Sequence, residues 1–298
     1  MKEKLAVWIS QKHGIPYRFR KSFIKRACPR ILSNYTFEIN YHGLRYVGNT
    51  RDIEDRNMFL LGGDDKHKIA FLKDYANAAK NDKFTFLDIG AKSGNHSLVV
   101  SKIVSTVHAF EPNPKVREAL NSKIYLNKLS NITVHPIGLS DRNDRIPFFA
   151  SEFNGNESGS FRSDHNLQNQ YLQDLDVRVG DELMAEHHVS KVDMLKVDVA
   201  GVEREVIEGL CKTIKESRPL IILELSKSTR KSFGSKDDFE SIFPADYNFY
   251  KFSRTSREKS SYKLTEFDYE TDTRELDIIA LPNEKKVYLN EKISKREK

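Results

Sequence analysis

This chain of 298 residues is poor in cysteine and lacks any long apolar run. Its two cysteines, Cys28 and Cys211, lie far apart, and neither has a second cysteine or a histidine at metal-ligand spacing. This excludes a disulfide framework and a cysteine zinc site. No segment reaches the ~18 to 20 apolar residues of a spanning helix, and the apolar stretch near Met1 is too short for a signal peptide. We therefore expect a cytoplasmic protein without a membrane span.

Positive charge is in excess, and it is unevenly distributed. The formal net charge is +6 and the isoelectric point about 9.0, with basic residues concentrated in 17–30 and 291–298. A basic segment interleaved with aromatic residues suits a nucleic acid, a membrane surface or an anionic substrate. The simplest interpretation is a solvated face and tail, since lysine and arginine are common on surfaces. The remaining composition, 38% hydrophobic and 31% charged, is typical of a globular protein.

Strands and helices alternate along most of the chain. Alternating apolar and polar residues around Gly43 predict a β-hairpin over 35–48. From residue 66, short apolar strands followed by helices predict a parallel sheet covered on both faces, ending in an antiparallel pair. Residues 139–190 are expected to be rich in loops. The expected strands are 84–90, 105–111, 131–138, 191–198, 219–225, 247–254 and 275–282, and the expected helices 67–80, 95–103, 114–128 and 201–217.

Residues 84–97, FTFLDIGAKSGNHS, join the first strand of the parallel sheet to the next helix. In open α/β sheets a ligand lies beyond the carboxyl ends of the strands, where this helix begins. Gly90 and Gly94 would let the backbone approach such a ligand closely. The turn lacks the middle glycine of the dinucleotide fingerprint G-x-G-x-x-G. This argues against a bound pyrophosphate and against a nicotinamide oxidoreductase.

Acidic residues stand at the carboxyl ends of successive strands, so their carboxylates are expected to converge on one crevice. Glu111 lies 21 residues after Gly90, where a carboxylate can accept two hydrogen bonds from a ribose diol. Asp141 follows the third strand and is placed to accept from an adenine amino group. Asp198 and Glu224 end the next two strands. The pattern favours a cofactor that contains adenosine.

The segments LDIGAKSGNHS, HAFEPNP, LNKLSNITVHPIGLSD, LKVDVAGVEREVIEG and RPLIILEL, in this order and spacing, resemble the FkbM family of S-adenosylmethionine-dependent methyltransferases. The resemblance covers residues 35–283. It implies the class I methyltransferase fold, a Rossmann-like α/β fold whose mostly parallel seven-stranded sheet carries helices on both faces, plus an N-terminal β-hairpin and helical extension. The chain then divides into this extension with its basic segment (1–65), the methyltransferase domain (66–285) and a basic tail (286–298).

The resemblance also implies S-adenosyl-L-methionine as the cofactor. The turn from Asp88 to Gly94 would hold its methionine end, Glu111 its ribose, and Ser140 with Asp141 its adenine, while Asn113 shapes the loop after Glu111. The implied cofactor-binding residues are Asp88, Gly90, Ala91, Gly94, Glu111, Asn113, Ser140, Asp141 and Asp198.

The usual reaction of the family is O-methylation, here of a hydroxyl on a small molecule, a sugar or glycan, or a polyketide-like acceptor. A hydroxyl nucleophile must lose a proton, and Asp198 is the first candidate for the general base. Glu203, the last acid of the family motif D-x-E-G-x-E, is expected to cap its helix or orient the acceptor. His96 is the histidine in the motif turn and the third candidate catalytic residue. No metal is expected, because Asp198 and Glu224 have no third oxygen ligand.

One residue departs from the family motif. Ala200 stands between Val199 and Gly201, where the family usually has a glutamate. A cofactor-binding module without turnover is therefore one alternative. A nucleic-acid methyltransferase is another, but amino-methylating enzymes of that kind usually carry an N/D-P-P-Y/F tetrad after the fourth strand, where this chain has DVAG.

Overall fold

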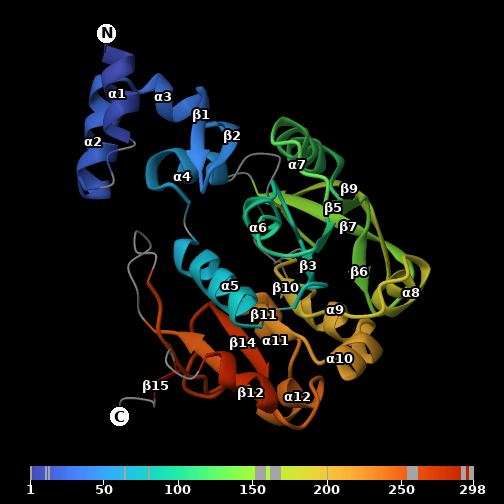
Figure 1. Ribbon diagram of the computed structural model, residues 1–298. Helices are drawn as coiled ribbons and strands as arrows, with labels where there is room; N and C mark the ends of the chain where they lie inside the picture. The colour runs from blue at the N-terminus through green and yellow to red at the C-terminus, as the bar shows by residue number, and fades with distance from the viewer. Residues whose placement is uncertain are drawn as a thin grey trace.

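A single large sheet forms the centre of the molecule (Figure 1). The computed structural model describes residues 2–10, 12, 14–63, 65–79, 81–151, 159–161, 169–199, 201–253, 261–289 and 293–294. The strands of this sheet are β3 (Thr85–Ile89), β4 (Thr106–Phe110), β5 (Ile132–His135), β10 (Met194–Val197), β11 (Leu220–Leu225), β12 (Tyr247–Phe252), β13 (Leu264–Glu266), β14 (Leu276–Pro282) and β15 (Ile293–Ser294). Their order across the sheet is β15-β13-β12-β14-β11-β10-β3-β4-β5.

The seven strands from β12 to β5 are those expected from the sequence. Neighbours among β5, β4, β3, β10 and β11 pair in parallel, and β14 runs antiparallel to both β11 and β12. This is the class I methyltransferase sheet, and the fold-class prediction is confirmed. The sheet is nevertheless wider than the expected seven strands, because β13 and β15 extend it beyond β12. Both additions are two or three residues long, too short to show a period in the sequence.

Helices cover both faces of the sheet because successive strand residues point to opposite sides. Phe86 of β3 packs under α5, whereas Leu87 packs in the apolar cluster that holds α8, α9 and α10. The helices of this part are α5 (Lys66–Ala79), α6 (Asn95–Val100), α7 (Pro114–Leu126), α8 (Gly180–Glu186), α9 (Glu203–Gly209), α10 (Cys211–Ser217), α11 (Lys227–Lys231) and α12 (Lys236–Ser241), followed by the 3-10 helix η1 (Asn283–Tyr288). The single helix expected over 201–217 is thus divided at Leu210.

A second sheet corrects the expectation that residues 139–190 are rich in loops. It contains β6 (Gly138–Ser140), β7 (Asp144–Ser151), β8 (Gly159–Ser160) and β9 (Asn169–Val179), in the order β6-β9-β7-β8. The expectation failed because β7 and β9 carry many charged and amide side chains, which hid the alternation of a half-buried strand. Residues 155–158, the first part of the polar sequence GNESGSF over 155–161, lie outside the described residues.

The N-terminal extension packs against the rest of the fold. It comprises α1 (Lys2–Ser10), α2 (Tyr17–Ala27), α3 (Arg30–Ser33), the strands β1 (Thr36–Tyr41) and β2 (Leu44–Asn49), and α4 (Ile53–Leu61). The two strands pair antiparallel, as the predicted hairpin required. Its apolar cluster also includes Ile69 of α5 and Leu98 and Val99 of α6. The domain limits at residues 65 and 285 remain predictions.

Gly209 lets α9 approach the second sheet closely. A Cβ built on Gly209 would lie 1.8 Å from the backbone oxygen of Ser140 in β6. We expect Gly209→Ala to lower the free energy of unfolding by about 1 to 3 kcal/mol, measured by urea denaturation, because backbone has to move to admit the methyl group. The matched control is Gly234→Ala, whose Cβ would meet nothing nearer than the Asp238 carboxylate at 3.9 Å. Equal stability of the two variants would contradict this account.

Candidate active site

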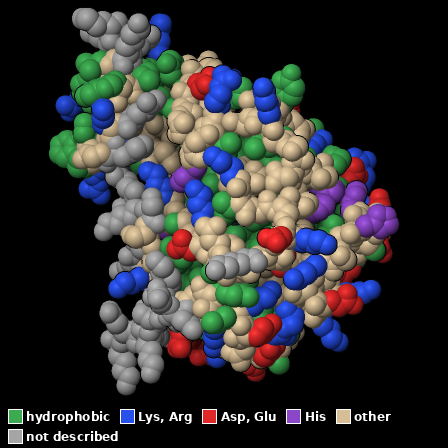
Figure 2. Space-filling view, viewed as in Figure 1, with side chains coloured by type: hydrophobic (Ala, Val, Ile, Leu, Met, Phe, Trp, Pro, Cys, Tyr) green, Lys and Arg blue, Asp and Glu red, His purple; other side chains and the backbone are tan. Residues whose placement is uncertain are grey.

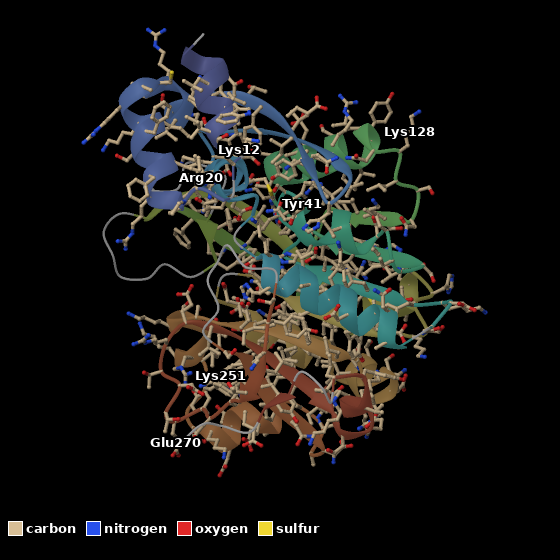
Figure 3. All side chains as sticks on the ribbon, turned by 60° about the vertical axis from the view of Figure 1, so that its left-hand side comes forward. Lys12, Arg20, Tyr41, Lys128, Lys251 and Glu270 are labelled. Carbon is tan, nitrogen blue, oxygen red and sulfur yellow. The ribbon has the colours of Figure 1, made fainter. Side chains whose placement is uncertain are left out.

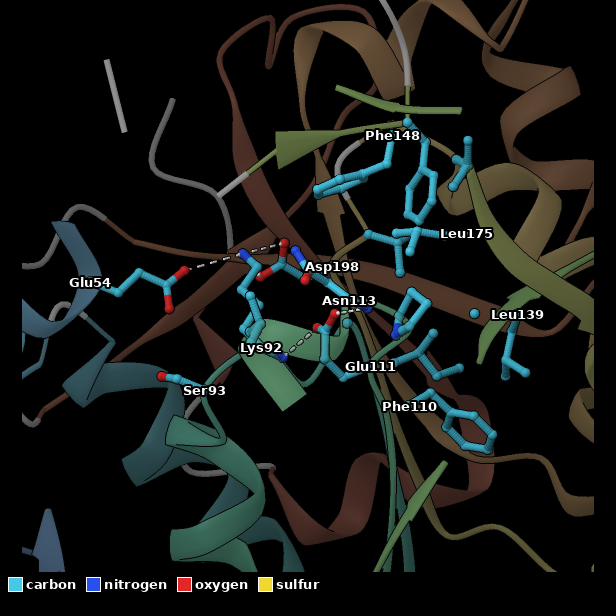
Figure 4. A pocket seen from close by; sticks show the side chains of 18 of the residues that line it. Glu54, Lys92, Ser93, Phe110, Glu111, Asn113, Leu139, Phe148, Leu175 and Asp198 are labelled. Carbon is cyan, nitrogen blue, oxygen red and sulfur yellow. Dashed lines mark hydrogen bonds and ion pairs between the residues drawn. The ribbon is translucent and has the colours of Figure 1, made fainter. Parts of the chain in front are cut away.

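A cavity of about 400 Å³ lies at the carboxyl ends of β3, β4, β10 and β11 (Figure 4). From β3 the chain continues to β4 and β5 on one side of the sheet and to β10 and β11 on the other. Ligands of open α/β sheets bind at such a reversal of strand order, and the volume lies in the range of small-molecule sites. The walls come from the turn after β3, the end of β4, the second sheet and the first turn of α4.

Glu111 lies at this cavity and is held there by backbone groups. The amide of Lys92 donates to its Oε2 at 3.0 Å, and the amide of Asn113 donates to its Oε1 at 2.9 Å. Burial raises the pKa of Glu111 to about 7, although both amides and the Lys92 ammonium oppose the rise. Each carboxylate oxygen keeps acceptor capacity for a further donor, such as a hydroxyl group.

The turn after β3 is tied to the neighbouring strands. The amides of Gly90 and Ala91 donate to the carbonyl of Phe110 at 3.1 and 3.0 Å, and Gly94 is the N-cap of α6. Gly90 has φ of 75°, and a Cβ there would lie 2.0 Å from the backbone oxygen of Asp198. Glycine is therefore required by the loop after β10. Gly90 also lines the cavity, so the expectation that it lets a ligand approach closely stays a prediction.

Asp88 is buried next to this turn and does not line the cavity. Ser97 donates to its Oδ2 at 2.6 Å, and the Lys196 ammonium lies 3.2 Å from its Oδ1. Burial alone would raise the pKa of Asp88, but Lys196, His96 and the Ser97 hydrogen bond outweigh it and lower the pKa. Asp88 is thus an ionised, buried anchor for Lys196.

Lys92 places an ammonium group among the carboxylates of the cavity. Its Nζ lies 3.0 and 3.1 Å from the two oxygens of Asp198 and 3.9 Å from Oε1 of Glu54 (Figure 4). Burial opposes its charge, but Asp198 and Glu54 hold its pKa well above the ordinary value. Among the described residues that line the cavity, Lys92 is the one base beside several acids. A role for Lys92 was not predicted from the sequence.

Asp198 and Glu224 form a pair with opposite protonation. Burial opposes the charge of Asp198, yet Lys92 and Lys196 hold its pKa well below the ordinary value. The charge of Asp198, together with burial, raises the pKa of Glu224 to about 8. At neutral pH one carboxylate is therefore ionised and the other protonated, an arrangement typical of acid and base pairs in active sites.

Glu203 is buried and braces the loop that follows Asp198. Its carboxylate accepts from the amides of Val199 and Gly201, at 3.0 to 3.1 Å, and from the hydroxyl of Thr229. It faces this backbone and does not line the cavity. Ala200, where the family usually has a glutamate, lies outside the described residues.

The residues expected at the adenine lie apart from the cavity walls. Ser140 is buried and donates to Asp141 at 3.1 Å, while Asp141 is exposed and pairs with Arg142 at 3.2 Å. Their neighbours Gly138 and Leu139 line the cavity instead. Asn113 lines it too, and its Oδ1 caps α7 by accepting from the amide of Lys115 at 3.1 Å.

His96 belongs to a smaller cavity of about 130 Å³. This cavity shares Glu54, Gly90, Lys92 and Asp198 with the larger one. Burial and the charge of Lys196 lower the pKa of His96 to about 4, so its imidazole is neutral at physiological pH. Nε2 makes no hydrogen bond among the described residues.

Two parts of the cavity wall were not predicted. The second sheet supplies the apolar side chains Phe148, Phe149, Leu175 and Val177, and Phe161 follows directly after β8. The extension supplies Ile53, Glu54 and Asp55 from the first turn of α4. Asp52 is the N-cap of α4 and accepts from the amide of Asp55. An aspartate before a helix is a local signal that could have indicated where α4 begins, but no local signal indicates that α4 lies over the cavity.

In the described parts of the chain, no three histidine, cysteine or acidic side chains are grouped so that they would hold a metal ion. No helix in these parts is both long and apolar enough to cross a membrane.

Comparison with known proteins identifies relatives. The chain is 30% identical over 140 residues to the hexuronic acid methyltransferase AglP of Haloferax volcanii, covering 46% of this chain and 54% of the relative. It is 27% identical over 146 residues to the 2-O-methyltransferase NoeI of Sinorhizobium fredii, covering 44% and 59%. The chain thus spans little more than half the length of these relatives. A crystal structure of an FkbM methyltransferase from Methylobacillus flagellatus aligns with 17% identity and a TM-score of 0.42, over 75% of this chain and 52% of that one.

The match to a family model covers more of the chain than the alignment with either of these two relatives. The model of the methyltransferase FkbM domain matches residues 88–249, more than half of the chain. This span begins at Asp88 under the turn and includes Glu111, Asp198 and Glu224. The chain therefore belongs to the FkbM methyltransferase family.

Proposed function

We propose that this protein transfers a methyl group from S-adenosyl-L-methionine to a hydroxyl group of a saccharide or another small-molecule acceptor. The observation that carries the proposal is the backbone-held carboxylate of Glu111 in a cavity at the reversal of strand order. The names of the two relatives, one acting on hexuronic acid and one a 2-O-methyltransferase, support a sugar hydroxyl as the acceptor.

The residues at the cavity fit the proposed cofactor. Phe110, Val116 and Leu139 offer an apolar surface for an adenine ring, next to the Glu111 acceptor for a ribose diol. Lys92 suits the carboxylate of an amino acid, and Asp198 suits its ammonium group. When bound, S-adenosylmethionine supplies a methyl group on a sulfonium, which is a good leaving group.

The chain's own contribution is to orient the acceptor and remove its proton. The second sheet and α4 cover the cavity, which positions the acceptor and limits water. Positioning of this kind can supply about 7 to 11 kcal/mol of the barrier reduction. We assign the proton acceptor to the Asp198 and Glu224 pair, since a base near the working pH is the more effective one. We assign Glu203 a positioning role, because it holds the loop after Asp198.

The test has two stages. Calorimetric titration with S-adenosylmethionine and S-adenosylhomocysteine should give micromolar binding of both. Transfer of a labelled methyl group should then occur to one or more members of a panel of neutral sugars, uronic acids and polyols, with an unstructured RNA as the competing acceptor. Binding without any transfer would favour the degenerate module, transfer to RNA would favour the nucleic-acid enzyme, and absence of binding would contradict the proposal.

A further inference from the structure

The first part of the chain has a charge distribution unlike the rest. From Lys4 to Phe37, both included, there are eight lysine and arginine residues and no acidic residue. This stretch alone therefore carries more positive charge than the net +6 of the whole protein. It includes α2 and α3 and most of α1.

These helices also expose large apolar side chains. Trp8 of α1 is 56% exposed and Phe19 of α2 is 71% exposed, with Leu5 and Phe23 exposed beside them in the same two helices. Figure 2 shows hydrophobic side chains over α1 and α2 with lysine and arginine around them. The Lys12 ammonium lies 4.7 Å from the centre of the Trp8 ring. Exposed apolar side chains that are grouped together mark sites of interaction more often than exposed apolar side chains that are scattered singly.

A buried arginine holds the two helices rigidly to the body of the protein. The guanidinium of Arg20 donates to the carbonyl of Ser10 at 2.7 Å, to that of Ile15 at 2.8 Å, and to that of Leu60 at the end of α4 (Figure 3). The other end of α4, Ile53 to Asp55, lines the large cavity. At 1.5 Å per residue, these nine residues of α4 span only about 14 Å. The contact with Arg20 and the cavity thus lie at opposite ends of one short helix.

We propose that the exposed face of α1 and α2 binds an anionic lipid surface. Tryptophan, phenylalanine and leucine next to lysine and arginine are the side chains with which interfacial helices enter the headgroup region. Basic residues add attraction to anionic lipids. A single-stranded nucleic acid would use the aromatic rings for stacking, but an exposed leucine adds nothing to it, so the observations favour the lipid. The interaction is peripheral and independent of the proposed reaction.

The experiment uses the full chain and sedimented vesicles. Vesicles of phosphatidylcholine mixed with phosphatidylglycerol should bind it at least tenfold more tightly than phosphatidylcholine alone, and added salt should weaken this binding. Trp8→Ser combined with Phe19→Ser should weaken binding about tenfold or more, because two apolar side chains no longer enter the lipid. Arg18→Glu combined with Lys25→Glu should do the same by reversing charge.

A matched charge reversal elsewhere on the protein tests whether vesicle binding depends on the position of the basic residues or only on the net charge of the chain. Lys83→Glu combined with Lys212→Glu changes the net charge equally on two other exposed surfaces and should leave vesicle binding within about twofold of the original chain. Circular dichroism of each variant verifies folding. Binding equal to neutral and anionic vesicles, equal losses in both charge-reversal variants, or preference for an unstructured RNA over anionic vesicles would each overturn the proposal.

Discussion

Glu111→Ala should weaken the binding of S-adenosylmethionine by about 100-fold. Glu111 offers two oxygens at the cavity, and each hydrogen bond to a charged group contributes about 1.5 to 3 kcal/mol. Loss of both acceptors therefore removes about 3 kcal/mol or more, which corresponds to this change in affinity. Calorimetric titration of the purified variant with S-adenosylmethionine and S-adenosylhomocysteine measures the effect. Both ligands should lose affinity equally, since they share the ribose.

Two further variants distinguish binding of the ribose by Glu111 from the hydrogen bonds with which Glu111 stabilises the turn after β3. Glu111→Gln keeps the size of the side chain and one acceptor oxygen, so its loss should fall between those of the original chain and Glu111→Ala. Glu118→Ala removes an exposed carboxylate from α7 in the same region and should bind normally. If Glu111→Ala keeps its thermal stability and still binds both ligands normally, Glu111 does not hold the ribose.

The pH dependence of affinity provides an independent measurement on Glu111. Its pKa is raised to about 7 by burial, so the carboxylate becomes protonated as the pH falls below 7. The protonated form has less acceptor capacity for two hydroxyl groups. Affinity for S-adenosylmethionine should therefore rise with pH up to about 7 and then level off. In Glu111→Gln this rise should disappear.

The sheet and its first turn were predictable because their signals are local. The parallel strands β3, β4, β10 and β11 are short apolar runs, and each is followed by a helix. Such a run predicts a buried strand from its own residues alone, wherever it lies in the chain. Glu111 was placed at the crevice because the carboxyl ends of parallel strands share one edge. The sequence therefore predicted the sheet and one wall of the site well.

The other walls depend on contacts that no local pattern carries. Lys92 meets Asp198 across 106 positions of the sequence, and its own neighbours look like an ordinary polar turn. Glu54 reaches the same lysine only because the extension folds back over the sheet. Gly90 was expected to lie at the crevice, and it lines the cavity. The sequence could not show that a backbone oxygen of the loop after β10 leaves no room for a side chain there.

Asp198→Asn should lower kcat/KM by about 10²- to 10⁴-fold and also change its pH dependence. The rate should come from the form in which the pair has lost its proton, so kcat/KM of the original chain should rise with pH towards about 8. The charge of Asp198 is the largest cause of the raised pKa of Glu224. Without that charge Glu224 loses its proton at lower pH, so the remaining activity should reach its plateau below pH 8. A pH series of initial rates with labelled methyl donor measures both effects.

Comparison with Glu224→Gln and Glu216→Gln identifies which group accepts the proton. Glu224→Gln removes the titrating carboxyl while Asp198 stays ionised through Lys92 and Lys196, so the rise towards pH 8 should vanish with most of the activity. Glu216→Gln alters an exposed acid of α10 and should retain both the rate and the profile. If Asp198→Asn lowers the rate but keeps the rise near pH 8, its charge does not set the titration. The carboxylate would then serve only to bind ammonium groups, that of Lys92 and that of the cofactor.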